Sequence, residues 1–462
     1  NLNGGAIESL SSNFSQWTMM SYVGRINYGL MDRYLLTASL RYDGSSRLSE
    51  GNKWALFPSA AIAWRITEED FAKNLDWLSN LKLRFSYGQA GNTNSVSPYA
   101  SEGTISGSVY YPFGTSTSVG NLPANIANPM LTWERTSEYN VGLDFGFLNQ
   151  RISGNIEYYN RTTNDLLMKR NIPVHLGYSS VTSNVGSVRN SGFELQLNTA
   201  NIMTKNFAWN TTINLAYNKN EIVSLADEED LSNYSIHLQG MRGRYSDKRF
   251  IGKPVDTNWT QNTIGVWQLG EEEEAAKYGC VPGNFKIKDY NNDGKLTDDD
   301  YIIDGKRTPD WTGGMTNMFK IYDFDFSFHM YFQAGATQYD RFFENFALEW
   351  NSQNFNNLRT NYWTPENPSN TMGRPSQMGS RGNIAYERTD FLKVSYITLG
   401  YTLNKRLMSK WGLDNARIYV TVQNPFILTK FRGLDPEQPD LTNIGDTDGM
   451  TMNALLGVNI SF

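Results

Sequence analysis

The sequence predicts an all-β protein, a transmembrane antiparallel β-barrel, on three observations. Apolar and polar residues alternate in one segment after another, which is the period of a β-strand with one apolar face and one polar face. Aromatic residues stand at the ends of the apolar stripes, as they do at the interfaces of membrane barrels. Connections between the segments alternate between short and long, as tight periplasmic turns and long extracellular loops do. A soluble β-sandwich is the alternative, but it has no reason to keep this alternation.

The strand at residues 452–462 shows the pattern most clearly. Its apolar residues occupy every second position: Met452, Ala454, Leu456, Val458, Ile460 and Phe462. The residues between them are mostly polar or small, with Leu455 as the exception. This spacing predicts a strand with one face in an apolar medium and the other in water.

The first half of the chain repeats this pattern. A hairpin is predicted with its turn near Met31 and Asp32, and Tyr34 and Tyr42 bound the apolar stripe of its second strand. The predicted strands lie near residues 22–30, 34–42, 54–66, 81–87, 139–147, 152–158, 193–197 and 207–217. A long polar, glycine-rich stretch at 91–131 separates the fourth of these strands from the fifth.

The second half contains the longest insertion, at roughly residues 219–310. Further strands are predicted near 313–321, 324–332, 392–403, 416–422 and 452–462. The alternation changes phase near Ser395 and Tyr396, which predicts a β-bulge at that point.

The pattern amounts to roughly thirteen strands, whereas single-chain bacterial barrels contain an even number. An open sheet edge in hydrocarbon leaves backbone groups unpaired, at a cost of several kcal/mol each. We therefore expect residues 1–462 to form the C-terminal portion of a larger barrel, whose first strands pair with the last one.

Composition narrows the class of protein. The chain has 41 Lys and Arg against 47 Asp and Glu, and this net charge of -6 argues against nucleic acid as a partner. No apolar run reaches the roughly 18 residues of a transmembrane helix. Cys280 is the only cysteine, so no internal disulfide is expected. No Ser/His/Asp constellation is visible, and we expect a protein that is not an enzyme.

Four segments resemble the SusC/RagA family of TonB-dependent outer-membrane transporters. They are YDGSSR at residues 42–47, NVGSVRNSGFEL at 184–195, DFLKVSYITLGY at 390–401 and VQNPFILTKFRGLDPE at 422–437. The segments are spread over nearly the whole chain, and together they are more specific than any one of them alone.

The resemblance implies a 22-stranded barrel with an N-terminal plug domain and a TonB box, neither of which matches a segment of this sequence. It implies active import of oligosaccharides or other oligomeric nutrients across the outer membrane. The implied partners are a SusD-like surface lipoprotein that acts as a lid, and TonB-ExbB-ExbD through the N-terminal part. An oligopeptide importer of the same family and a passive outer-membrane porin are the alternatives. The sequence does not identify the nutrient or the residues that contact it.

The long insertion contains a motif with the spacing of a calcium loop at residues 289–300. Oxygen ligands would come from Asp289, Asn291, Asp293, the Lys295 carbonyl and Asp300. Gly294 would provide the sharp turn, while Asp300 replaces the usual glutamate at the twelfth position, so that modest affinity is expected. Calcium here would stiffen an extracellular loop. The alternative is a solvated turn held by the same side chains without a metal ion.

Overall fold

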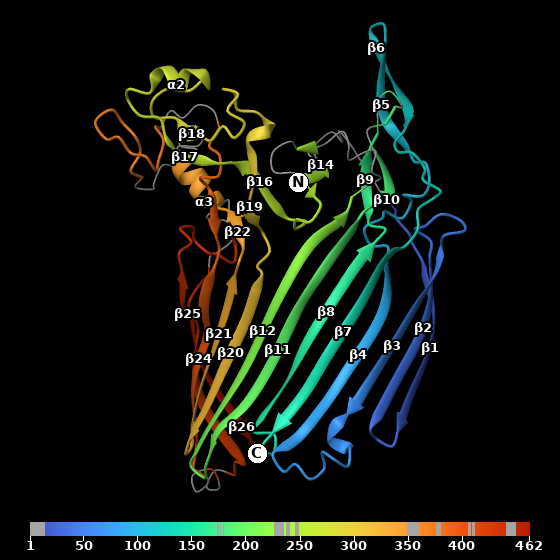
Figure 1. Ribbon diagram of the computed structural model, residues 1–462, viewed down its shortest axis with the longest axis vertical. Helices are drawn as coiled ribbons and strands as arrows, with labels where there is room; N and C mark the ends of the chain where they lie inside the picture. The colour runs from blue at the N-terminus through green and yellow to red at the C-terminus, as the bar shows by residue number, and fades with distance from the viewer. Residues whose placement is uncertain are drawn as a thin grey trace, which may run out of the picture. The chain divides into compact units, whose positions relative to one another are not determined.

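The computed structural model describes residues 14–172, 175, 177–178, 180–225, 235–236, 241–244, 249–348, 360–375, 380–404, 408, 412–439 and 450–462. Its largest element is a thirteen-stranded antiparallel sheet (Figure 1). In sheet order the strands are β1 (Met19–Leu30), β2 (Tyr34–Ser45), β3 (Trp54–Arg65), β4 (Leu78–Asn92), β7 (Glu134–Phe147), β8 (Ile152–Asn164), β11 (Ser187–Met203), β12 (Phe207–Ser224), β20 (Trp311–Ile321), β21 (Phe324–Ala334), β24 (Phe391–Thr402), β25 (Asn415–Thr429) and β26 (Asn453–Ser461). Sheet order follows chain order, so the predicted strands and their succession are confirmed.

Short turns join the strands at one end of each hairpin. Met31 and Asp32, between β1 and β2, have φ angles of 54° and 55°. Two successive positive φ angles are characteristic of the type I′ turn, whose twist matches that of the flanking strands. Tyr322 also adopts a positive φ of 55° in the short connection between β20 and β21.

Most of the remaining elements lie in the long connections, and η2 (Ile66–Glu68) lies in the connection between β3 and β4, at the end of the sheet that carries the short turns. The elements in the long connections are β5 (Ile105–Phe113), β6 (Ser116–Pro123), β9 (Leu167–Asn171), β10 (Ser180–Asn184), β13 (Ser235–Ile236), β14 (Met241–Arg244), β15 (Arg249–Phe250), β16 (Thr257–Gln261), β17 (Thr263–Val266), α2 (Glu272–Lys277), β18 (Phe285–Ile287), η4 (Asp298–Asp300), β19 (Tyr301–Lys306), β22 (Thr337–Tyr339), α3 (Arg341–Phe343), η5 (Glu344–Leu348) and β23 (Tyr386–Arg388). The predicted alternation of short and long connections is present from β4 onward, whereas the connection between β3 and β4 is longer than the one between β2 and β3.

The predicted bulge lies in β24. Val394 and Tyr396 are both paired with neighbouring residues of β21, and Ser395 is the extra residue between them. The register against β25 shifts at the same place. The bulge restores the apolar face, because Val394 before it and Ile397 after it fall on the same side of the sheet.

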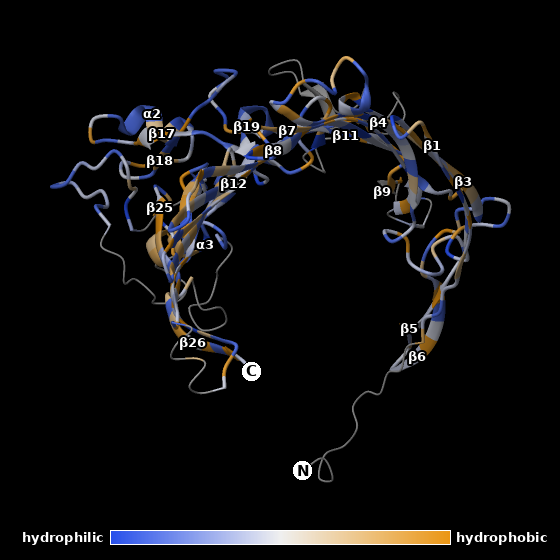
Figure 2. Ribbon diagram, turned by 90° about the horizontal axis from the view of Figure 1, so that it is seen from below, coloured by the Kyte–Doolittle hydropathy of each residue, from blue (hydrophilic) through white to orange (hydrophobic). Residues whose placement is uncertain are grey.

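Apolar and polar residues follow one another along strands such as β12 and β26 (Figure 2). Leu399 in β24 is aligned with Val420 in β25, and Val420 with Leu456 in β26. All three side chains are exposed, Leu456 to 74%. A row of exposed large apolar side chains requires an apolar medium or a partner.

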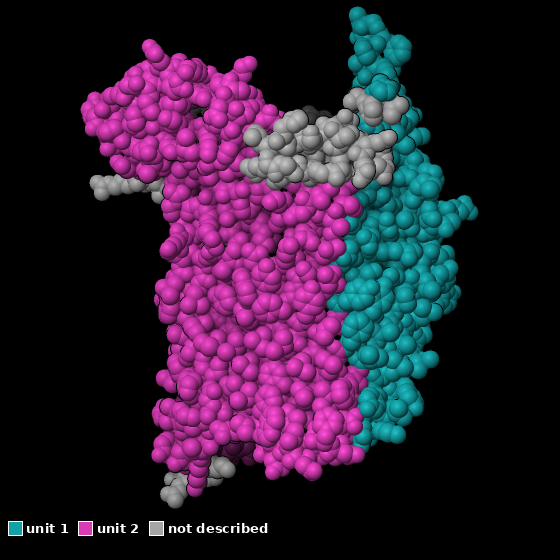
Figure 3. All heavy atoms as spheres, viewed as in Figure 1, with its two compact units in different colours: residues 1–62, 85–139, 161–187 teal, residues 63–84, 140–160, 188–462 magenta. Residues whose placement is uncertain are grey.

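The chain divides into two compact units (Figure 3). Unit 1 comprises residues 1–62, 85–139 and 161–187, and its core includes Leu48, Phe57, Leu131 and Trp133. Unit 2 comprises residues 63–84, 140–160 and 188–462, and its largest cluster of buried apolar side chains lies in the loop segments.

Candidate functional site on the polar face and in the long loops

An ion-pair network on the polar face of unit 2 joins three neighbouring strands. The Arg84 guanidinium in β4 lies 2.8 Å from Asp144 in β7 and 2.8 Å from Glu157 in β8. Lys82 lies 2.6 Å from the second carboxylate oxygen of Asp144. A Cβ at Gly142 would lie 3.0 Å from the guanidinium carbon, so glycine leaves room for Arg84 to cross β7.

A second ion pair crosses a strand in the same way. Arg417 in β25 lies 2.5 Å from Asp325 in β21, with β24 between the two strands. A Cβ at Gly400 of β24 would lie 2.5 Å from the Asp325 carboxylate and 2.6 Å from the Arg417 guanidinium. Both charge pairs thus span three strands across a glycine, and both keep charged groups on the polar face.

A hollow of about 400 Å³ also lies on the polar face of unit 2. Its polar lining comes from β8, β11, β12 and β21 and includes Asn155, Glu157, Glu194, Gln196, Asn214, His329 and Tyr331. His329 Nδ1 lies 2.9 Å from the Thr316 hydroxyl, which fixes the orientation of the ring. Carboxylates, amides and a phenol can hydrogen-bond to the hydroxyl groups of a sugar or to the backbone of a peptide.

Two long connections of unit 2 fold together into a domain-like structure that we call the cap. The cap comprises the described residues of 249–310 and 336–388. Its buried core consists of Val266, Phe285, Ile287, Phe343, Leu348, Trp363, Met372 and Ala385. Asn383 joins the two connections by accepting a hydrogen bond from the Thr263 amide, at 2.9 Å, and donating one to Asp304, at 2.8 Å.

The connection between β4 and β7 in unit 1 carries a two-stranded hairpin, β5–β6, which we call the hairpin. Tyr110 and Val119 are directly opposed across it and are exposed to 67% and 65%. Phe113 is exposed to 66%. An isolated two-stranded ribbon is marginally stable in water, and this one presents large apolar side chains without covering them.

The segment predicted to bind calcium turns sharply around Asp289. Asn292 and Gly294 have φ angles of 56° and 78°, which allows the chain to turn sharply around Asp289. The amides of Asn292 and Gly294 donate to the Asp289 carboxylate, at 2.6 and 2.9 Å. Partial burial acts to raise the pKa of Asp289, but these hydrogen bonds and one from Tyr278 hold it below its ordinary value.

The other predicted ligands lie in the same turn. Asn291 and Asp293 are exposed, and Asp293 accepts a hydrogen bond from the Lys295 amide at 2.8 Å. Asp300 is fully buried, and its two carboxylate oxygens accept hydrogen bonds from the Tyr290 and Thr297 amides, each at 2.8 Å. In the part of the chain that the structure describes, no three His, Cys, Asp or Glu side chains are grouped as a metal centre. Metal binding at this loop therefore remains a prediction.

Comparison with known proteins identifies the family. A family model described as "TonB dependent receptor-like, beta-barrel" matches residues 2–312. The chain belongs to this family. Its relatives include TonB-dependent receptor P26 of Formosa agariphila, 33% identical over 98% of this chain and 47% of that protein. TonB-dependent receptor SusC of Bacteroides thetaiotaomicron is 35% identical over 96% of this chain and 44% of that protein.

Solved structures show the same fold. The RagAB peptide importer in its "open-open" state matches with a TM-score of 0.80 at 24% identity, over all of this chain and 49% of that one. The "closed-closed" state matches with a TM-score of 0.78, over 50% of that chain. The chain thus spans about half the length of the relatives it matches.

Family membership gives the sheet its environment. In a TonB-dependent receptor β-barrel of the outer membrane, the apolar face of the strands meets lipid and the polar face meets the lumen. The exposed row of Leu399, Val420 and Leu456 is therefore a lipid-facing row. No helix among the described residues is long and apolar enough to span a membrane.

Sequence reasoning did not find the network of Arg84, Asp144 and Glu157. Period two places Lys82 and Arg84 on the polar face, but the partners of a charge across three strands depend on register. The glycine at 142 was the one available signal, because a side-chain-free position in a strand indicates a close approach by another group.

Proposed function

We propose that the intact protein imports oligosaccharides or other oligomeric nutrients across the outer membrane, driven by TonB-ExbB-ExbD and assisted by a SusD-like lipoprotein lid. The observation that carries the proposal is the similarity to SusC over 96% of this chain. The polar hollow beside Glu157 and Glu194 supports it, because a polar lumen wall suits a hydrated, hydrogen-bonding cargo.

A peptide cargo is the second candidate. It is favoured by the likeness in fold to RagAB, which is described as a peptide transporter. Carboxylates such as Glu157 and Glu194 suit the amino groups of peptides as well as sugar hydroxyls. The polar lining of the hollow therefore fits both cargoes, and an experiment must distinguish them.

The exposed surface of the hairpin supports the proposal of a lipoprotein lid. Tyr110, Phe113 and Val119 offer an apolar and aromatic surface at the end of a long connection, on the extracellular side in this family. Exposed aromatic side chains of this kind commonly anchor protein interfaces. We infer that the lipoprotein lid covers this surface.

Growth of a deletion strain tests the transport function. Complementation with the intact protein is expected to restore growth on an oligosaccharide as sole carbon source, and inactivation of TonB is expected to abolish it. Restored growth on peptides alone would favour the second candidate. Growth that persists without TonB would indicate a passive porin and would overturn the proposal.

We also propose that residues 289–300 bind calcium. Asp289, Asn291, Asp293, the Lys295 carbonyl and Asp300 would hold the ion, which would supply rigidity to the cap. The fit is supported by Asp300, a fully buried carboxylate with no ion-pair partner among the described residues and with lone pairs left for a cation.

Terbium luminescence excited through nearby tyrosines tests the calcium proposal. Binding by the intact protein is expected at about 10⁻⁴ to 10⁻³ M. Asp300→Asn should weaken it at least tenfold, whereas Asp299→Asn, outside the ligand spacing, should not. Chelation should increase proteolysis within 289–300. Equal binding by both variants would contradict the proposed ligand set.

A further inference from the structure

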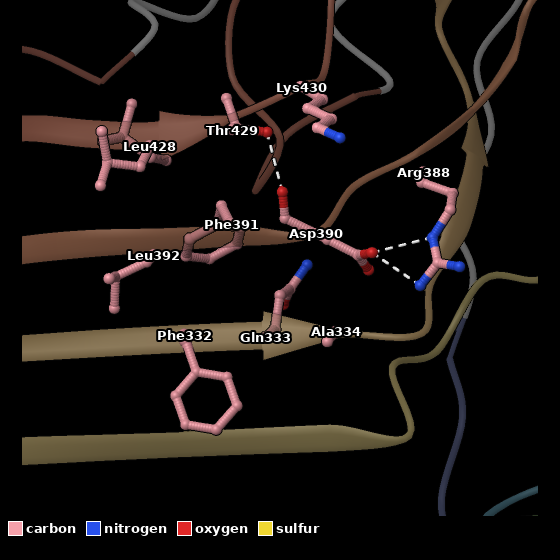
Figure 4. Close-up of a pocket in the computed structure, with 11 residues that line it drawn as sticks. Phe332, Gln333, Ala334, Arg388, Asp390, Phe391, Leu392, Leu428, Thr429 and Lys430 are labelled. Atoms are coloured by element: carbon pink, nitrogen blue, oxygen red, sulfur yellow. Dashed lines mark hydrogen bonds and ion pairs between the residues drawn. The ribbon is translucent and has the colours of Figure 1, made fainter.

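The long-loop ends of three adjacent strands in unit 2 line a large hollow. β21, β24 and β25 lie side by side, and their register aligns Phe332 with Leu392 and Leu392 with Leu428. These residues continue the lipid-facing rows, and Leu392 and Leu428 are exposed to 37% and 60%. The hollow beside them has a volume of about 1090 Å³ (Figure 4).

Charged side chains follow directly beyond this apolar row. Lys430 directly follows the end of β25, Asp390 directly precedes β24, and Arg388 is the last residue of β23. Lys430 and Arg388 both line the hollow and are both exposed. Lys430 has no ion-pair partner among the residues that the structure describes.

Arg388 is positioned but retains free donors. Its Nε and one Nη atom lie 2.8 and 2.6 Å from the same carboxylate oxygen of Asp390 (Figure 4). The other Asp390 oxygen accepts a hydrogen bond from the Gly335 amide at 2.7 Å, which anchors the pair to the end of β21. A guanidinium carries five N–H donors, so Arg388 can still bind an oxyanion.

We propose that this hollow, which we call the rim site, binds a phosphorylated glycolipid of the outer leaflet. The acyl chains lie along Phe332, Leu392 and Leu428, and the phosphate is held by Lys430 and Arg388. Along the strands the surface changes from apolar to cationic in the same order in which such a lipid changes from acyl chain to phosphate. Basic pockets at the membrane boundary select anionic head groups in this way.

The rim site is independent of the proposed transport function. Its apolar lining comes from the lipid-facing residues Phe332, Leu392 and Leu428, and Gln333, Phe391 and Thr429 of the alternate row complete the lining at the strand ends. The polar hollow lies elsewhere on β21 and is lined by His329 and Tyr331. It requires only that the sheet spans the outer membrane, with its long loops outside. Loss of transport would leave the proposal intact.

Lipid retention by the intact protein tests the rim site. The protein would be extracted from the outer membrane and washed in detergent until bulk lipid is removed, and bound lipid would be measured by native mass spectrometry. We expect one tightly retained phosphorylated glycolipid. Lys430→Gln with Arg388→Gln should lower retention about tenfold or more, since both cations attract the phosphate of the lipid. Lys205→Gln, an exposed lysine in the short turn before β12, is the matched control.

Three further measurements make the outcome decisive. Glycolipid from which the phosphates have been removed should be retained as weakly as by the double variant, and inorganic phosphate should not displace the intact lipid. Leu428→Gln should also lower retention, while the heat-modifiable migration of the folded barrel stays unchanged. Equal retention by the double variant and the Lys205→Gln control would overturn the proposal. The proposal would also be overturned if the double variant lost the lipoprotein lid but kept the glycolipid. That result would assign the hollow to a protein partner.

Discussion

The cap and the hairpin are both built from long connections, but they treat apolar surface in opposite ways. The cap buries Phe285, Trp363 and their neighbours in a core of its own, and Asn383 ties its two connections together. The hairpin leaves Tyr110, Phe113 and Val119 exposed and has only its own two strands to hold it. The cap has an apolar core of its own, whereas the hairpin presents its large apolar side chains on its surface.

The difference separates two roles that extracellular loops can have. A loop with a buried core keeps one conformation, because the burial of its own apolar side chains offsets the conformational entropy lost on ordering. A loop with exposed aromatic side chains buries them only when a partner covers them. Its apolar residues therefore contribute to binding and not to folding. Substitutions should therefore change the stability of the cap and the partner affinity of the hairpin.

The largest expected effect comes from emptying the core of the cap. Phe285→Ala removes a fully buried ring, and such truncations cost about 3–5 kcal/mol. Phe113→Ala removes the same ring from the exposed hairpin and should leave the free energy of unfolding nearly unchanged. Hydrogen exchange of the cap amides measures the first effect, and hydrogen exchange of the hairpin amides measures the second. Equal loss of protection in the two variants would mean that the hairpin also has a core.

A smaller effect is expected from the tie between the two connections of the cap. Asn383→Ala leaves the Thr263 amide and the Asp304 carboxylate without this partner, which should cost about 1–3 kcal/mol. Asn125→Ala is the counterpart at the base of the hairpin, where Asn125 accepts from the Thr104 amide at 2.7 Å. Asn383→Ala should lower amide protection in both connections of the cap. Asn125→Ala should affect only the amides around Thr104, and a wider effect would contradict the view of the hairpin as a separate ribbon.

The strands of the sheet could be predicted because each one carries its own signal. Period two located β26 and the bulge at Ser395 without knowledge of any neighbour, whereas the register between strands was not predicted. The cap could not be predicted in this way. Trp363 and Phe285 are 78 positions apart in the sequence, and no local pattern indicates that they share a core. The residues of the calcium loop were found together only because they are adjacent in sequence.

The residues of the rim site could also be predicted only in part. Phe332 and Leu392 lie in predicted period-two strands, whereas Leu428 lies beyond the strand predicted at 416–422, because β25 continues to Thr429. That Lys430 and Arg388 line one hollow depends on the alignment of β24 with β25, which the pattern of either strand alone does not contain. Groups of side chains that act together across strands are therefore the part of the site that could not be predicted from the sequence.

The surface of the hairpin should affect partner affinity. Replacing the opposed pair with Tyr110→Ser and Val119→Ser removes exposed apolar surface, and co-purification of the lipoprotein lid should fall about tenfold. Ser118→Ala, opposite Tyr111 on the other face, is the control and should have no effect. Unchanged unfolding of the variant would confirm that the pair contributes to binding alone. Undiminished capture of the lid would place the lid elsewhere.

The smallest effect is a pH dependence that only the cap should have. Asp340 in the cap is fully buried, and burial raises its pKa although the Phe343 amide donates to it. A raised pKa in the folded state means that the folded cap holds a proton that the unfolded chain releases. The stability of the cap therefore falls as pH rises from the ordinary aspartate pKa of about 3.9 through the raised value. Asp340→Asn keeps the oxygen that accepts from Phe343 and should remove this loss. The variant cap should therefore be more stable than the natural cap at neutral pH and equally stable near pH 3.

The hairpin, which contains no acidic, basic or histidine side chain between residues 105 and 123, should unfold independently of pH over the same range. A neutral-pH advantage of Asp340→Asn that persists at pH 3 would show that the gain comes from packing and not from the carboxylate.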